Sequence, residues 1–335
     1  MCVSFVSFGF RFRINVEAMN MAGRVGNYER HRTAPIIRQV LEDRKVRYEV
    51  HFLPVVSGQS IANAYTRALV DIALRRRLPV CGECRRYNEL NGFPKRPNIE
   101  GEGDSVNKRV TECVVEDVTG FMVTQSGDRS GEGRAFRRTS RIEFSYLIPD
   151  VDSAYHIPPM PQIHVRYGEK EKEQMLYNIE SGSAIYTLVV NIDVDGIGRG
   201  IKSTASDRET RVKASLDALM LMLNGGYVGA KKSRYFPQIE PLGAVAVVSD
   251  PYPFEVSPPK AKLNNDGTLQ PWYLEDTLKR AVAFKSVFTE DSLTMYYLDN
   301  EFNWSPGNVD GSIKVVRVED INTLIARVRE SVKVK

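Results

Sequence analysis

The 335-residue sequence is poor in the residues that most often build disulfide scaffolds and metal centres. It contains only four cysteines, four histidines and two tryptophans. Four cysteines are too few for a disulfide-stapled scaffold, so a cytoplasmic location is the default expectation. No run of about 18 apolar residues is present, and no membrane-spanning helix is expected. The first segment also lacks the basic start and small-residue cleavage site of a signal peptide.

Common catalytic and metal motifs are missing as well. The sequence has no G-x-S-x-G nucleophile elbow and no H-E-x-x-H motif, and its scattered histidines neither support nor exclude a Ser-His-Asp site. Cys81 and Cys84 form a C-x-x-C pair, but a second such pair, needed for four zinc ligands, is absent. Cys113 or Cys2 could complete a set only if folding brought them there. We therefore expect no catalytic residue, no metal and no cofactor.

Positive charge is clustered although the net charge is only +4. Seven Arg or Lys residues face three acids between Arg24 and Arg47, and five Arg residues lie between Arg129 and Arg141. Clustered cations indicate a site for a polyanion. A solvated charged surface explains any one cluster equally well.

The N-terminal third begins with a strand and a helix. Alternation of apolar and polar residues predicts a strand over 6–16, with one apolar face made of Val6, Phe8, Phe10, Phe12, Ile14 and Val16. A basic, glycine-containing loop is expected over residues 21–35. A helix is predicted to start at the Ser57-Gly58-Gln59-Ser60 turn and to stop at Pro79.

The rest of the sequence completes an α+β plan. Strands are predicted over 162–167, 183–194 and 242–250, and helices over 209–226 and 320–332. The order strand, helix, strand, strand, helix, strand is that of a ferredoxin-like or RRM-like core. We expect one domain over 1–335 with two insertions. The first, 77–160, contains a thumb-like hairpin, and the second, 251–312, is rich in Pro and Asn with short strands.

Three segments have the chemistry of phosphate binding. The first basic loop carries Asn27, Arg30, His31 and Arg32, whose side chains and backbone N–H groups suit phosphate oxygens. The Ser57 turn opens a helix, and free N–H groups there favour an anion. The segment GGYVGAKKSRYFP adds Lys231, Lys232 and Arg234, with Tyr227 and Tyr235 available for stacking. For the first basic loop the structural alternative is a polar loop without a ligand, and for the Ser57 turn it is a plain helix cap.

The segment AFRRTSRIEF has a different character. It places Phe136 beside Arg137, Arg138 and Arg141 near an expected hairpin tip, which suits insertion between bases. A solvated loop is the alternative. The strand over 183–194 does not match the aromatic signature with which RRM domains stack bases. If the protein binds RNA, we therefore expect the loops and the insertion, rather than the sheet face, to hold it.

These segments occur in a familiar order. GNYERHRTAP, FLPVVSGQSIANAYTRALVDIA, GFM, FRRTSRI, YLIPD, HVRY, SAIY and GGYVGAKKSRYFP follow one another between about residues 5 and 250. Each is modest alone, but the ordered set resembles the DevR-type backbone subunit of type I-A CRISPR Cascade complexes, the Cas-seven family. The last 85 residues add little to the resemblance.

The resemblance implies a modified RRM-like palm with large insertions and no catalytic activity. Copies of such a subunit stack head to tail along a CRISPR RNA beside other Cascade subunits. A thumb-like hairpin of one copy kinks the RNA next to its neighbour, and the guide pairs with target DNA in antiviral defence. Guide sequences vary, so a protein of this kind must hold phosphates and leave base edges free.

Residue by residue, the resemblance assigns RNA contacts to the segments described above. The phosphate-binding residues would be Asn27, His31, Arg32, Ser57, Gly58, Ser60, Lys231, Lys232 and Arg234. The thumb would contain Arg137, Arg138, Thr139 and Arg141. On the segment HVRY, His164 and Arg166 are weaker candidates.

Two other functions remain open at the level of sequence. An RRM-like endoribonuclease that processes CRISPR RNA would need a general acid or base at the cleavage phosphate, and His31 is the only candidate in the loop. RNA-cutting relatives carry an Asp after the first strand, whereas the only acid within residues 20–35 is Glu29. A transcriptional regulator would need sequence-specific base contacts, for which no residues stand out.

Overall fold

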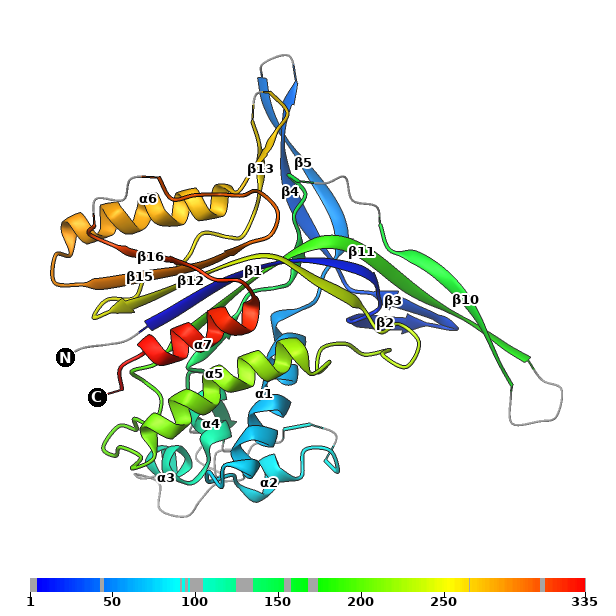
Figure 1. Ribbon diagram of the computed structural model, residues 1–335. Coiled ribbons are helices and arrows are strands. Elements are labelled where there is room, and N and C mark those ends of the chain that lie inside the picture. Colours follow the sequence, from blue (N-terminus) through cyan, green and yellow to red (C-terminus); the bar gives the residue numbers. More distant parts are fainter. Residues whose placement is uncertain are drawn as a thin grey trace.

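The computed structural model describes residues 5–42, 45–90, 92–93, 96, 105–124, 135–153, 158–167, 174–264, 266–307 and 311–334. A large mixed sheet lies between helix α6 on one face and helices α1, α5 and α7 on the other (Figure 1). The fold is therefore α+β, as predicted. Within the described ranges, no helix is both long and apolar enough to cross a membrane.

The elements follow one another along the chain as strands and helices in mixed order. The strands are β1 (Phe5–Glu17), β2 (Met21–Val25), β3 (Tyr28–His31), β4 (Thr33–Glu42), β5 (Lys45–Pro54), β6 (Phe121–Thr124), β7 (Ala135–Arg138), β8 (Ile142–Phe144), β9 (Ile148–Pro149), β10 (Met160–Tyr167), β11 (Gln174–Asp193), β12 (Gln238–Asp250), β13 (Lys262–Leu263), β14 (Leu269–Gln270), β15 (Ser292–Asp299) and β16 (Lys314–Arg317). The helices are α1 (Gly58–Arg75), α2 (Gly82–Arg85), α3 (Ser105–Glu112), α4 (Val114–Thr119), α5 (Arg208–Asn224), α6 (Trp272–Val287) and α7 (Ile321–Ser331).

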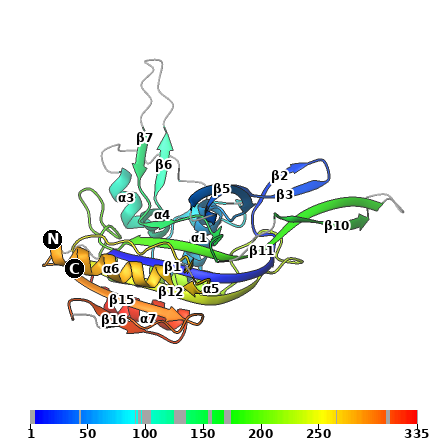
Figure 2. The same ribbon diagram turned by 90° about the horizontal axis from the view of Figure 1, so that it is seen from above.

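The main sheet has ten strands with β1 at its centre. Its order is β16-β15-β12-β1-β11-β3-β2, and β8, β9 and β10 also pair with β11. Strand β1 is antiparallel to both neighbours, β11 and β12. The 20-residue β11 pairs with β1 over its C-terminal part and with β10 over Gln174–Ser181. The β10–β11 hairpin projects from the core as a result (Figures 1 and 2).

Strand β1 is buried on both faces. The predicted apolar face packs against α1 and α5, and Phe10 stacks on Phe8 with ring centroids 5.6 Å apart. On the opposite face Arg11 is fully buried and forms an ion pair with Asp150. Val16 was predicted on the apolar face but is 55% exposed, because the register with β11 shifts after Ile14.

The two hairpins of the first 54 residues differ from the prediction. The segment 21–35, expected to be a loop, forms β2, β3 and the start of β4. Strands β4 and β5 then form a separate projecting hairpin (Figure 1). The alternation of Val46, Tyr48, Val50 and Phe52 with polar residues is the sequence signal of this hairpin.

Helix α1 begins where it was predicted to begin but ends earlier. It ends at Arg75, four residues before the expected stop at Pro79. The chain turns at Arg77, which has a φ of 57°, and the Leu78 N–H donates to the Ala73 carbonyl at 2.9 Å. A left-handed residue with a hydrogen bond back over the last turn is a common way to end a helix.

Two other segments also differ from the prediction. Residues 162–167 were expected to form the second core strand, but β10 pairs only with the projecting part of β11. The place beside the core part of β11 is taken by β8 and β9. The segment 251–312, expected to contain only short strands, includes the 16-residue helix α6 and the eight-residue strand β15. The prolines at the start of this segment favoured irregular structure, so the helical pattern that follows them was not recognised.

The predicted hairpin in the first insertion is present as β6 and β7. Strand β6 pairs with β7 antiparallel, and the hairpin stands away from the sheet (Figure 2). Arg137 and Arg138 lie opposite Met122 and Phe121, at the base of the hairpin rather than at the predicted tip. The connecting residues 125–134 and the side chain of Phe136 lie outside the described part of the chain.

Candidate nucleic-acid interface

A buried carboxylate at the end of β1 organises the first predicted site. Glu17 accepts hydrogen bonds from the Tyr186 hydroxyl (2.8 Å) and the Met19 N–H (2.7 Å). His31 Nε2 lies 2.8 Å from Glu17 Oε1, and its Nδ1 lies 2.8 Å from the Arg32 carbonyl. Burial alone would lower the pKa of His31, but the hydrogen bond and charge of Glu17 outweigh burial and raise that pKa. His31 therefore holds β3 against β1 from inside the protein.

Arg32 joins the first predicted site to the N-terminus of α1. With its amide turned so that the oxygen faces them, the Asn20 side chain accepts hydrogen bonds from Arg32 Nε (3.0 Å) and from the Ser57 N–H (3.1 Å). Ser57 caps the helix, because its hydroxyl accepts the Ser60 N–H at 3.3 Å. A Cβ added at Gly58 would lie 2.6 Å from a backbone carbonyl oxygen of β8, so glycine is required there. The predicted helix start is confirmed.

The loop between α5 and β12 places its cations against the same region. Lys231 Nζ lies 2.5 Å from Glu29 Oε2 on β3. Lys232 Nζ donates to a backbone carbonyl of its own loop at 2.6 Å, and Arg234 donates to the Tyr177 hydroxyl at 2.6 Å. Each cation thus has an acceptor within the chain, and Lys231 and Lys232 are partly exposed while Arg234 is exposed.

His164 lies beside this loop. Its ring stacks on Tyr177 with centroids 5.2 Å apart, and its Nε2 is hydrogen-bonded to the Tyr235 hydroxyl. Tyr235 was predicted to stack on a ligand but is only 7% exposed, so it serves to hold His164 and the loop together. The side chain of Arg166 lies outside the described part of the chain.

Arg67 on α1 belongs to this region and was missed from sequence. Its guanidinium stands over the rings of Tyr87 and Tyr227, at 5.8 and 6.0 Å from their centroids. Burial, with the charge of Arg67, lowers the pKa of Lys232. A signal was present, because Arg67 lies seven residues after Ser60 and therefore on the same side of the helix.

The four predicted thumb residues divide into two kinds. The Arg138 guanidinium is almost fully buried, with Nη2 2.5 Å from Asp117 Oδ1 and further bonds to backbone carbonyls. Arg141 is partly buried and forms an ion pair at 2.8 Å with an acid at the end of β11. Arg137 and Thr139 are exposed. Arg138 thus supports the hairpin base, and Arg137 and Thr139 remain accessible.

A groove of about 250 Å³ connects the hairpin base to α1. Its lining includes Gln59 from α1 and Ser140 from the turn after β7. Asn27 lies outside this groove, in the turn between β2 and β3, where its carbonyl accepts the N–H of Asn178 on β11 at 2.8 Å. We call this whole surface the α1-end strip. Its members are Asn27, Arg32, Gln59, Ser60, Arg67, Arg137, Thr139, His164, Lys231, Lys232 and Arg234.

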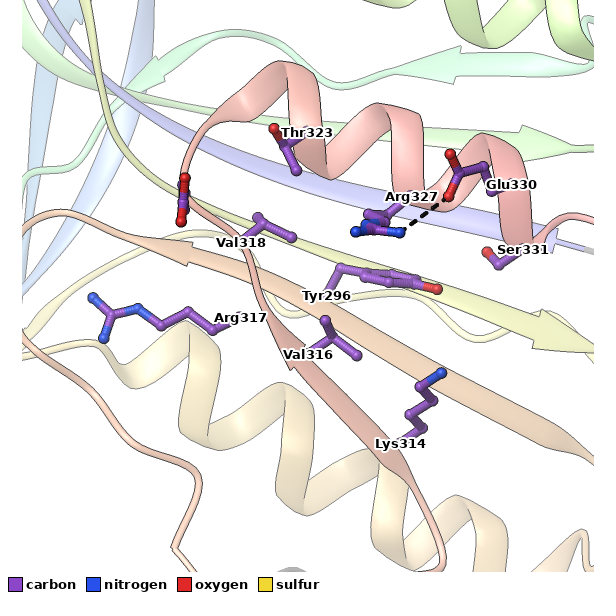
Figure 3. A pocket seen from close by; sticks show the side chains of 10 residues that line it. Tyr296, Lys314, Val316, Arg317, Val318, Thr323, Arg327, Glu330 and Ser331 are labelled. Atoms are coloured by element: carbon purple, nitrogen blue, oxygen red, sulfur yellow. Dashed lines mark hydrogen bonds and ion pairs between the residues drawn. The ribbon is translucent and has the colours of Figure 1, made fainter.

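A larger groove lies at the opposite edge of the main sheet. It has a volume of about 580 Å³ and runs between β16 and α7 (Figure 3). Lys314 and Arg317 line it together with Glu330, which forms an ion pair with Arg327 at 3.3 Å. Its charge is mixed, so it is a weaker match for a polyanion than the α1-end strip.

The comparisons with known proteins point to one family. The family described as "CRISPR-associated negative auto-regulator DevR/Csa2" matches residues 8–266. "CRISPR-associated protein Cas7/Csa2 1" of Saccharolobus solfataricus is 35% identical over 271 residues, which cover 76% of this chain and 81% of the relative. "CRISPR-associated aCascade subunit Cas7/Csa2 2" of the same organism is 30% identical over 320 residues, which cover 88% and 92%.

Solved structures agree with the fold. A chain of a "CRISPR RNA-guided surveillance complex, pre-nicking" matches with a TM-score of 0.53 at 13% identity, covering 98% of this chain and 99% of that chain. A chain of a "CRISPR RNA-guided surveillance complex" matches with a TM-score of 0.50 at 12% identity, covering 98% and 99%. At these identities the match shows the shared fold alone. By the span of the family match and the identity of its relatives, this chain belongs to the CRISPR-associated DevR/Csa2 family.

Proposed function

We propose that this chain is the crRNA-binding Cas7 backbone subunit of a type I-A CRISPR surveillance complex. The observation that carries the proposal is the α1-end strip, which gathers a helix N-terminus, two cationic loop segments and a hairpin base on one surface. It holds the guide by phosphates and leaves the bases free to pair with target DNA. The relatives named Cas7/Csa2, one of them an aCascade subunit, support the same assignment.

The strip suits phosphates better than bases. Helix α1 has no acid in its first turn, so its N–H groups and dipole favour an anion there. Lys231, Lys232 and Arg234 already hold their nitrogens against internal oxygens, and a phosphate oxygen would compete with these acceptors for the same donors. The proposed ligands exclude His31 and Arg138, because both side chains are buried in hydrogen-bond networks. They also exclude Ser57 and Gly58, which are buried, and Arg141, which is paired with Asp193.

The same geometry supports a subunit without catalytic activity. The endoribonuclease alternative depends on His31 as a general base. Its ring nitrogens are occupied by Glu17 and the Arg32 carbonyl, and the side chain is fully buried. Glu29, the one acid within residues 20–35, is paired with Lys231 rather than with another carboxylate. A two-metal nuclease site needs paired carboxylates.

We assign the central sheet to an RRM-like palm within a single domain. The strands β1, β8 with β9, β11 and β12, with α1 and α5 as the connecting helices, follow the β-α-β-β-α-β order of that fold. The first insertion, predicted over 77–160, runs only to the start of β8 at Ile142, because β8 and β9 belong to the palm, and the β6–β7 hairpin is its thumb. The range 251–312 is the second insertion.

Two exposed apolar stripes support assembly of copies along the RNA. On β5, the side chains of Val46, Tyr48 and Phe52 are more than half exposed, and on β10 the same holds for Ile163 and Val165. These hairpins project from the core in different directions (Figure 1). Two unlike surfaces on one chain can meet head to tail and generate an open helix. Other Cascade subunits would cover the ends of such a filament.

RNA binding can be tested by fluorescence anisotropy with single-stranded RNAs of unrelated sequence. We expect similar affinities for all of them, falling steeply with salt. Replacing Lys231 and Lys232 by Ala should weaken binding and reduce the salt slope by roughly 0.7 for each lost phosphate contact. The matched control replaces the exposed Lys279 and Lys314, far from the strip. Equal binding by both double variants, or a strong preference for one sequence, would contradict the proposal.

Assembly and the absence of cleavage need separate measurements. Electron microscopy of the protein with long RNA should show regular helical assemblies, which neither an endoribonuclease nor a regulator predicts. RNA incubated with the protein and a divalent metal should stay intact. Cleavage that disappears in the His31→Gln variant, with the variant still folded by circular dichroism, would favour the endoribonuclease instead.

A further inference from the structure

Three cysteines that are distant in sequence meet in the first insertion. The sulfur atoms of Cys81, Cys84 and Cys113 all lie within 4.8 Å of one another. All three residues are buried, with exposures of 8%, 1% and 0%. Two thiolates on one tetrahedral zinc ion, each with a bond of about 2.3 Å, lie about 3.8 Å apart. The observed cluster is therefore close to the spacing that a zinc ion imposes.

The backbone holds the cluster in place without a bond between the sulfurs. Cys81 precedes the short helix α2, and the Arg85 N–H donates to the Cys81 carbonyl at 3.0 Å, so Cys81 and Cys84 lie on one side of a tight turn. Cys113 separates α3 from α4. The next N–H, of Val114, donates to the Pro79 carbonyl at 2.9 Å, which ties this junction to the turn.

The surroundings suit thiolates. The backbone N–H groups of Cys81 and Glu116 are placed to interact with the Cys113 sulfur. Backbone N–H groups aimed at a sulfur also stabilise a metal-bound thiolate. Arg96, held by Glu116 at 2.6 Å, is close enough for its charge to interact with Cys81.

We propose that Cys81, Cys84 and Cys113 bind one zinc ion as thiolates and that this ion fixes the base of the thumb hairpin. Soft sulfur ligands favour zinc over hard cations such as magnesium, and three thiolates leave the fourth position of a tetrahedral zinc ion to a further ligand. Each coordinated thiol releases its proton to solvent on binding, with no redox change. The ion would link α2 to α4, which continues directly into β6. This role is independent of whether the protein binds RNA.

Three other states of the cluster make different predictions. A disulfide between two of the cysteines would leave a single reactive thiol and would respond to reductant rather than to chelator. An iron–sulfur cluster would give iron and acid-labile sulfide with a coloured protein. Three inert buried thiols would bind no metal at all.

The test is metal analysis of the full-length protein purified in reductant without chelator. We expect one zinc per chain by mass spectrometry of the metal content and, after exchange with Co²⁺, a sulfur-to-metal charge-transfer band. Cys84→Ser and Cys113→Ser should lose both signals. The matched control is Cys2→Ser, which changes the fourth cysteine and should keep them. Removing the metal from the wild-type protein with a chelator should lower its melting temperature, and adding zinc should restore it. This measurement needs no cysteine variant, so it still tests the proposal if a variant fails to fold.

Several results would overturn the proposal. These are the absence of zinc together with the absence of a charge-transfer band in the wild-type protein, bound iron in place of zinc, and retention of the metal by Cys84→Ser or Cys113→Ser. Loss of metal in Cys2→Ser would show that the three clustered cysteines are not sufficient. An unchanged melting temperature after chelation would remove the structural role.

Discussion

The assignment of His31 to the interior predicts a stability that depends on pH. Among the described residues, His31 is the only histidine that contacts Glu17, and both side chains are fully buried. Replacing His31 by Ala leaves the Glu17 carboxylate buried without this partner. Breaking a buried pair by removing one member costs about 3–5 kcal/mol. At low pH we therefore expect the His31→Ala variant to have a free energy of unfolding about 3–5 kcal/mol below that of the wild type.

The sign of the pH dependence follows from the raised pKa of His31. The folded protein binds the proton more tightly than the unfolded chain, whose histidine has the ordinary value of 6.5. The ionic contribution is therefore complete below about pH 6.5 and is lost as pH rises through the folded pKa. The difference between wild type and His31→Ala should be larger at pH 6 than at pH 9, where a neutral hydrogen bond remains.

Urea unfolding of both proteins across this pH range measures the difference directly. The control is His51→Ala, because His51 is partly exposed and lies 3.3 Å from the partly exposed Glu49. Exposed pairs of this kind contribute about 0–1 kcal/mol, so little change is expected. If His31→Ala lost less than about 1 kcal/mol, or lost the same amount at pH 6 and pH 9, the ring would not be the buried clamp described above.

Two further predictions use matched pairs of variants. Arg138→Ala should reduce the free energy of unfolding by about 1–3 kcal/mol, because buried backbone carbonyls lose their donor while Asp117 keeps its ion pair with Arg211 at 3.1 Å. Arg137→Ala should leave stability unchanged and weaken RNA binding; the reverse pattern would exchange their roles. Gly58→Ala should destabilise the protein by about 1–3 kcal/mol because its Cβ would meet a backbone carbonyl at 2.6 Å. Gly82→Ala meets nothing within 4 Å, so thermal unfolding should separate these two glycine variants clearly.

The sequence predicts those helices and strands whose apolar residues recur with the period of the element itself. Strand β1 and helices α1, α5 and α7 were placed within a few residues, because each has an apolar period that matches its secondary structure over many residues. Helix α6, with 16 residues, is close in length to α1 and α5 but was missed. The segment before it is rich in Pro, and its apolar residues face β15, which belongs to a sheet whose central strand is distant in the sequence.

Burial of charged residues could not be predicted in the same way. Arg137 and Arg138 are adjacent in the sequence, yet one is exposed and the other is paired with Asp117, which lies 21 residues earlier. His31 is buried because β1 ends beside β3, a contact that depends on the strand order of the whole sheet. Composition shows that cations are clustered, but tertiary pairing decides which of them are available to a ligand.

The pairing of these cations with internal acceptors also limits how strongly the α1-end strip can bind RNA. Lys231 lies 2.5 Å from Glu29, so a phosphate must compete with this carboxylate for the same ammonium group. Glu29→Gln removes the competing charge and keeps the shape of the side chain. A partly exposed ion pair contributes about 0.2–1 kcal/mol, so RNA affinity should rise by roughly up to fivefold. The rise should disappear in the Lys231→Ala background when both are measured by anisotropy at one salt concentration. A fall in affinity would mean instead that Glu29 positions Lys231 for the phosphate, and the acid in the first basic segment would then belong to the site.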